Sequence, residues 1–122
     1  MRKRFLDFAR LAATPNQPDS MDTLTFRNNA DQHRFEAVDG NTLAGYVEYN
    51  QLTNATMLAH TEVLPAYEGK GVGSFLARES IGALRDAGKR LIPVCPFIAS
   101  YLRKHRELLD VVDADVQKAY RI

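Results

Sequence analysis

Between residues 33 and 63, apolar and β-forming residues occur in three runs, and turn-forming residues separate each run from the next. The first two runs, residues 33–38 and 42–49, flank Asp39-Gly40, a dipeptide typical of two-residue β-hairpins. The third run, residues 55–63, is long and mostly apolar, and it ends before Pro65. The pattern predicts an antiparallel pair of strands followed by a central strand.

After residue 71 the apolar residues adopt three- and four-residue spacing, which predicts a helix over residues 72–87 that ends at Gly88. The predicted apolar stripe consists of Val72, Phe75, Leu76, Ala83, Leu84 and Ala87. A short apolar strand is expected over residues 91–95, where Pro93 has no N–H to donate. Pro96 suits the first turn of a second helix, and residues 108–122 are expected to be helical as well.

The order of these elements predicts an α/β fold class with a mixed sheet. Antiparallel strands come first, and a strand, a helix, a strand and a last helix follow, with a right-handed crossover between two parallel strands. A chain of 122 residues suits one domain. We expect residues 1–20 to form an N-terminal extension or linker and residues 21–122 to form the domain.

The charge balance indicates a small-molecule partner. With 16 basic and 15 acidic residues, the chain has no charge excess that would favour nucleic acid or an anionic membrane as its main partner. The basic run Arg103-Lys104-His105-Arg106 is expected to be a solvated helix face. The apolar runs are too short to cross a bilayer.

Cys95 is the only cysteine, which excludes an internal disulfide and suits a reducing, cytoplasmic setting. The histidines, His33, His60 and His105, are scattered and form no ligand pair with it. We therefore expect no metal site.

Three glycines in five positions, Gly69, Gly71 and Gly73, connect the third predicted strand to the first predicted helix. Glycines at a helix start let a ligand approach the backbone, and the helix N-terminus favours a phosphate. A dinucleotide-binding motif would have glycine where Leu76 stands, and a P-loop would have Ser or Thr where Gly71 stands. A tight turn without a ligand is the alternative, and Lys70 is either a phosphate contact or a solvated loop lysine.

The segment Glu68-Gly69-Lys70-Gly71-Val72-Gly73 resembles the acetyl-CoA loop of the GNAT superfamily of N-acetyltransferases. It matches that loop at Gly71 and Gly73, and it has Glu68 where the family has Gln or Arg. His60-Thr61 before the loop and Ile92-Pro93-Val94-Cys95-Pro96-Phe97 after it resemble the minimal single-domain GNAT-like proteins. The resemblance covers residues 33–107.

This resemblance implies acetyl-CoA as the cosubstrate and an amine as the acceptor. The CoA pyrophosphate would bind to backbone N–H groups of the loop and the first helical turn, which are Gly69, Lys70, Gly71, Val72, Gly73 and Ser74. The pantetheine arm would run between two splayed parallel strands, one over residues 55–63 that ends at Val63 and one over residues 91–95.

Four side chains are candidates for catalysis. His60 and Glu62 are two apart on a strand and share one face, so either could take a proton from the acceptor; a packed histidine and a solvated glutamate are the alternatives. Cys95 is either a nucleophile that takes the acetyl group, assisted by His60 or the following helix, or a small buried hydrophobe. Tyr101 resembles the tyrosine that protonates the departing CoA thiolate in many GNAT enzymes, and it could equally pack in the core.

The sequence therefore predicts an acetyl-CoA-dependent N-acetyltransferase that acts on a small amine or a protein lysine. The acceptor cannot be read from the sequence, and a second protein could complete its site. Two alternatives are a CoA-binding or acyl-sensing module without turnover and a protein-interaction domain.

Overall fold

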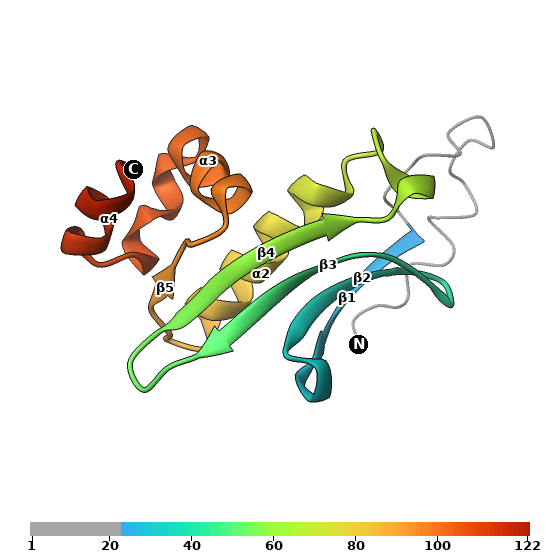
Figure 1. Ribbon diagram of the computed structural model, residues 1–122, viewed down its shortest axis with the longest axis horizontal. Coiled ribbons are helices and arrows are strands. Elements are labelled where there is room, and N and C mark those ends of the chain that lie inside the picture. Colours follow the sequence, from blue (N-terminus) through green and yellow to red (C-terminus); the bar gives the residue numbers. More distant parts are fainter. Residues whose placement is uncertain (1–22) are drawn as a thin grey trace.

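A computed structural model describes residues 23–122 of the chain, which form a five-stranded sheet with helices against it (Figure 1). The strands follow one another in chain order across the sheet, as β1 (Leu24–Asn29), β2 (Arg34–Asp39), β3 (Thr42–Gln51), β4 (Thr56–Val63) and β5 (Leu91–Ile92). The first four strands are antiparallel, and β5 is parallel to β4. The predicted α/β class with a mixed sheet is confirmed.

The α-helices follow β4 and β5 in the chain. Short 3-10 turns lie at η3 (Ala30–Gln32), η4 (Pro65–Tyr67) and η5 (Arg106–Val111), and the α-helices are α2 (Val72–Asp86), α3 (Pro96–Lys104) and α4 (Ala114–Tyr120). Helix α2 crosses one face of the sheet, whereas α3 and α4 gather beyond the β5 edge (Figure 1). The helix predicted over residues 72–87 is confirmed as α2, and the helix predicted to begin at Pro96 is confirmed as α3. The tail is helical only in part, because η5 has 3-10 geometry.

Two predictions need correction. The strand predicted over residues 91–95 is limited to Leu91–Ile92, because Pro93 cannot donate to the ladder that pairs β4 with β5. Strand β1 was not expected at all, because Leu24 and Phe26 are its only apolar residues and its place in the sheet comes from pairing with β2. The proposed boundary at residues 20 and 21 lies outside the described residues.

Apolar side chains from the sheet and from α2 form the core between them. Phe35 and Val47 face each other across β2 and β3, and Phe35 also packs on Tyr49, with ring centroids 4.8 Å apart. On α2, Val72, Phe75, Leu76 and Leu84 are buried, so most of the predicted stripe is confirmed, and Ile81, which the stripe did not include, is buried as well. Ala87 is exposed, because it lies after the helix ends.

Gly45 brings the start of α2 close to the sheet. A Cβ at this position would lie 2.7 Å from the backbone oxygen of Glu62 and 3.2 Å from Val72 and Leu76 side-chain atoms. Only glycine therefore lets the first turn of α2 pack directly on β3 beside the end of β4.

Candidate functional site

The glycine loop between η4 and α2 forms one side of a pocket of about 310 Å³, which we call the loop pocket. Its lining residues are Val63, Tyr67, Glu68, Gly69, Gly71, Val72, Gly73, Ser74 and Phe97. All of the cofactor residues predicted from the sequence are among them except Lys70. The sequence analysis assigned no binding role to Tyr67, Glu68 and Phe97, although Glu68 lies in the loop motif and Phe97 in the motif that follows it.

The N-terminus of α2 is open toward an anion. Gly69 and Gly71 have left-handed backbones, with φ of 79° and 84°, and Gly71 is the N-cap residue without a side chain that could cap the helix. The first helical bond runs from the Phe75 N–H to the Gly71 carbonyl, at 3.0 Å, so the N–H groups before Phe75 have no partner within the helix. The first turn contains no acidic residue. These groups and the helix dipole make the pocket suitable for a phosphate.

The segment before the loop is fixed to the β2–β3 hairpin. The Tyr67 hydroxyl donates to the Asp39 carboxylate at 2.8 Å, and the Leu64 N–H donates to the Ala44 carbonyl at 2.9 Å. The hydrogen bond to Asp39, with burial and the Asp39 charge, raises the pKa of Tyr67. The loop therefore starts from a defined position at the carboxyl end of β4.

Cys95 lies between β5 and α3, and its side chain belongs to the core. It is 4% exposed, and its sulfur lies 3.4 Å from the Thr61 hydroxyl on β4. Its N–H donates to the Leu58 carbonyl at 2.8 Å, and it is the N-cap residue of α3. Cys95 is thus at the positive end of a helix, as expected, and its side-chain partner is Thr61.

His60 and Glu62 form a second pair on the opposite face of β4. His60 Nε2 lies 2.9 Å from Glu62 Oε1, and the two side chains are 54% and 45% exposed. Thr61, between them in the chain, faces the core with its cross-strand neighbour Val47, whereas His60 faces outward with Glu48. The structure brings His60 to Glu62 as predicted, but it does not bring His60 to the Cys95 sulfur.

A β-bulge at Ala59 separates these two faces. Tyr49 pairs with Leu58 and Glu48 pairs with His60, so Ala59 is an extra residue without an opposite partner. Leu58 on one side of the bulge is fully buried, and Thr61 on the other side also faces the core. Without the bulge, Leu58 and His60 would lie on the same face.

The comparisons with known proteins agree with this architecture. The sequence pattern described as GCN5-related N-acetyl-transferase matches residues 34–111, from β2 to the end of η5. The chain belongs to this family. A GCN5-like candidate N-acetyltransferase from Staphylococcus aureus, solved by NMR in solution, has a similar fold, with a TM-score of 0.58 and 23% identity over 75% of this chain and 90% of that chain. No curated protein matches the chain.

Tyr101 on α3 makes packing contacts, which were one of the two roles left open for it. Its ring stacks on His105, with centroids 4.0 Å apart and planes 19° apart, and it packs against the core. His105 Nδ1 lies 2.8 Å from the Tyr101 carbonyl oxygen, which holds the two residues together. These contacts account for the aromatic ring without a ligand.

A buried carboxylate, Glu36, was not expected from the sequence. Its side chain is 1% exposed and accepts hydrogen bonds from Arg27 at 2.6 Å, Arg34 at 2.7 Å and Asn29 at 2.9 Å. Burial alone raises its pKa, but the bonds from Asn29, Arg34 and Arg27 outweigh that effect and lower the pKa to about 2. Glu36 is therefore an ionised anchor between β1 and β2, and both of its carboxylate oxygens are already hydrogen-bonded.

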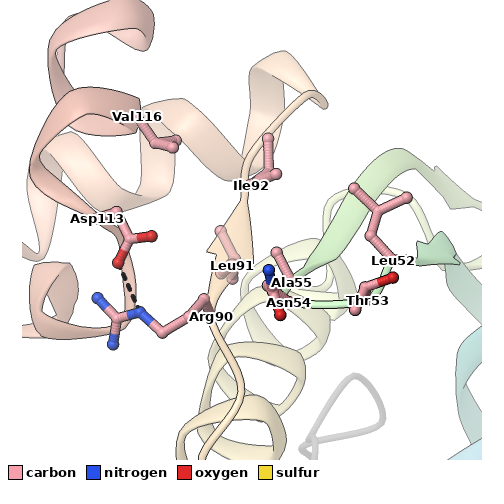
Figure 2. A pocket seen from close by; sticks show the side chains of 9 residues that line it. All are labelled: Leu52, Thr53, Asn54, Ala55, Arg90, Leu91, Ile92, Asp113 and Val116. Atoms are coloured by element: carbon pink, nitrogen blue, oxygen red, sulfur yellow. Dashed lines mark hydrogen bonds and ion pairs between the residues drawn. The ribbon is translucent and has the colours of Figure 1, made fainter.

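A second pocket, of about 460 Å³, lies at the other end of β4, and we call it the turn pocket. Figure 2 shows Leu52 from the β3–β4 turn and Val116 from α4 on opposite sides of it. Arg90 on its rim is bound to the Asp113 carboxylate at 2.8 Å and to the Asp110 carbonyl at 2.9 Å. The charged residues that line the turn pocket, Arg90 and Asp113, thus already have partners within the protein.

Within residues 23–122, no group of three or more His, Cys, Asp and Glu side chains could hold a metal ion. None of the helices in that range is long and apolar enough to cross a membrane.

Proposed function

We propose that this protein binds acetyl-CoA at the loop pocket and transfers the acetyl group to an amine, either of a small molecule or of a protein lysine. The observation that carries the proposal is the uncapped N-terminus of α2, which opens into a pocket at the carboxyl end of β4. Membership in the GCN5-related N-acetyltransferase family supports acyl transfer. A reducing, cytoplasmic setting would keep Cys95 free.

The loop would hold the phosphate end of the cosubstrate. Backbone N–H groups from Gly69 to Ser74 would bind the diphosphate, and Lys70 would add a charge-assisted contact of roughly 1–3 kcal/mol. The pantetheine arm would follow β4 inward from Val63. The space for it is supported by the short contact between β4 and the β5 segment, which consists of the pairing at Leu91 and Ile92 and the hydrogen bond from the Cys95 N–H to the Leu58 carbonyl.

His60 and Glu62 are the proposed proton acceptors from the amine. An amine that approaches from the exposed face of β4 would attack the acetyl carbonyl, and its proton would pass to the His60 imidazole. The bond between the acetyl carbon and the CoA sulfur would then break, and CoA would leave as its thiolate. The Glu62 carboxylate, 2.9 Å away, would stabilise the imidazolium. Tyr101 would supply the proton to the departing CoA thiolate only if its hydroxyl points to that sulfur, and its stacking on His105 favours a packing role.

Cys95 offers a second route through a covalent intermediate. Its thiolate would attack the acetyl carbonyl, the bond to the CoA sulfur would break, and the amine would then displace Cys95 from the acetyl group. The position of Cys95 at the N-terminus of α3 supports this route, whereas its burial and its contact with Thr61 support direct transfer.

A turnover assay tests the proposal. Release of free CoA from acetyl-CoA would be followed with a panel of amines and lysine-containing peptides. We expect at least one acceptor to be turned over and the rate to fall at least about tenfold in His60→Gln, which removes a general base that is typically worth more than that. Glu48→Gln, the exposed cross-strand neighbour of His60, is the matched control and should keep its activity.

Mass spectrometry under turnover separates the two routes. An acetyl group on Cys95 would support the covalent route, and an unmodified Cys95 in the active enzyme would exclude it. CoA binding without turnover of any acceptor would instead favour a CoA-binding or sensing module. Absence of CoA binding would leave only the protein-interaction alternative, in which the glycine turn is structural.

A further inference from the structure

Phe97 is unusual among the described apolar residues because it is exposed. Its side chain is 41% exposed, and only Leu52, at 44%, is a comparably exposed large apolar residue within residues 23–122. The apolar residues that α3 turns toward the core are Ile98, Ala99 and Leu102. Phe97 therefore adds little to the core of the protein, and its exposed ring is available to a ligand.

The ring of Phe97 lies directly on Gly73. A Cβ at Gly73 would come within 3.0 Å of Phe97 Cζ and within 3.4 Å and 3.7 Å of two further ring atoms. Gly73 lies inside α2 and, unlike Gly69 and Gly71, does not have a left-handed backbone. Since alanine would favour a helix by about 1 kcal/mol over glycine, the backbone does not account for this glycine. The Phe97 ring does.

The same ring lies between the two parts of the proposed site. It contacts the first turn of α2, where the diphosphate would bind, and it is two residues from Cys95, where the thioester would lie. Together with Val63 and Val72 it gives the loop pocket an apolar wall. Such a wall suits the alkyl part of the pantetheine arm better than a phosphate.

We infer that Phe97 is a binding residue for the pantetheine arm of CoA, and that residue 73 is glycine in order to admit the Phe97 ring. The inference rests on the proposed function. It reassigns Gly73, because the sequence alone attributed all the loop glycines to the approach of the diphosphate.

Two ligands separate the effect of Phe97 on the pantetheine arm from any effect on the phosphates. CoA contains both parts, whereas ADP has a diphosphate but no pantetheine, and its affinity can be measured by competition against a fluorescent CoA derivative. We expect Phe97→Ala to weaken CoA about tenfold and to change ADP less than twofold. Phe97→Leu should keep most of the CoA affinity. Leu52→Ala, which removes an equally exposed apolar side chain at the turn pocket, is the matched control and should leave both affinities unchanged.

A double-mutant cycle tests the pairing of Gly73 with Phe97. Gly73→Ala should weaken CoA about tenfold in the wild type but less than twofold in a Phe97→Ala background, because the clash with the ring is gone. Equal losses in both backgrounds would overturn the pairing, and an equal loss of CoA and ADP in Phe97→Ala would overturn the pantetheine assignment. If the wild type binds CoA and Phe97→Ala binds it with the same affinity, this inference fails and the proposed function stands. If it binds no CoA, the proposed function fails as well.

Discussion

The two ends of strand β4 each carry a pocket, and the smaller one is the better candidate for a ligand. The loop pocket has a volume of about 310 Å³ and the turn pocket about 460 Å³. Strand β4 has eight residues, so the pockets are separated by roughly 23 Å at about 3.3 Å per residue. The loop pocket is distinguished by the backbone N–H groups at the N-terminus of α2, which have no partner within the helix. Pocket volume does not indicate which of the two pockets binds a ligand.

Chain direction explains the difference. The loop pocket lies at the carboxyl end of β4, where the following helix presents its N-terminus and free N–H groups. The turn pocket lies at the amino ends of β4 and β5, and its charged side chains bind each other or backbone carbonyls (Figure 2). An anion would find free backbone donors at the first end, whereas the charged side chains at the second already have partners.

The largest expected effect on ligand binding comes from a matched pair of glycines at the two ends of α2. Gly71 and Gly88 both have left-handed backbones, with φ of 84° and 70°. Valine should strain either position, but only Gly71→Val alters the proposed phosphate site. We expect it to weaken CoA at least about 100-fold, equivalent to about 2.8 kcal/mol, and Gly88→Val to weaken CoA less than about threefold.

Thermal shift and calorimetric titration with CoA would measure both variants. Because a ligand that binds the folded state raises its stability, the CoA-induced rise in Tm should disappear only in Gly71→Val. Similar losses in the two variants would mean that backbone strain, rather than position in the loop, controls binding.

The largest expected effect on stability, as distinct from ligand binding, concerns the charged cluster around Glu36. Its pKa is lowered from 4.5 to about 2, so the folded state is stabilised above about pH 4.5, and this stabilisation is lost as pH falls from 4.5 to 2. The shift corresponds to about 3 kcal/mol. Urea unfolding of Glu36→Gln should show a loss of about this size at neutral pH and a much weaker pH dependence in that window.

Glu48→Gln is the control for this experiment, because Glu48 is an exposed carboxylate on the next strand. It should change the free energy of unfolding by less than about 0.5 kcal/mol. A wild-type stability that does not fall between pH 4.5 and pH 2 relative to Glu36→Gln would contradict the role assigned to the cluster.

The smallest effect is expected at the turn pocket. Arg90 and Asp113 are 40% and 56% exposed, and an exposed ion pair contributes about 0–1 kcal/mol. Asp113→Asn should therefore lower the free energy of unfolding by less than about 1 kcal/mol and leave the CoA affinity unchanged. A loss of CoA affinity in this variant, measured by the same titration, would assign the ligand to the turn pocket and reverse the comparison.

Much of the fold could be predicted because its signals are local. The hairpin at Asp39-Gly40, the change to helical spacing at Val72 and the helix start at Pro96 each depend on neighbouring residues, and the structure agrees with them. Strand β1 could not be predicted, since it is held by pairing with β2 and by the ring of Phe26 stacked on Phe35 at 5.3 Å. The cluster around Glu36 could not be predicted either, because its partners come from two strands that are brought together only by folding.

The sequence by itself determined where the loop pocket would be, because consecutive residues form a glycine turn, a helix N-terminus and most of the pocket lining. Only the tertiary structure decided which side chains meet around it. The bulge at Ala59 turns Thr61 toward Cys95 and His60 away from it, and α3 brings Phe97 onto Gly73. The physical reason is that strand register and helix packing are set by contacts between segments distant in the chain, which a local pattern does not contain.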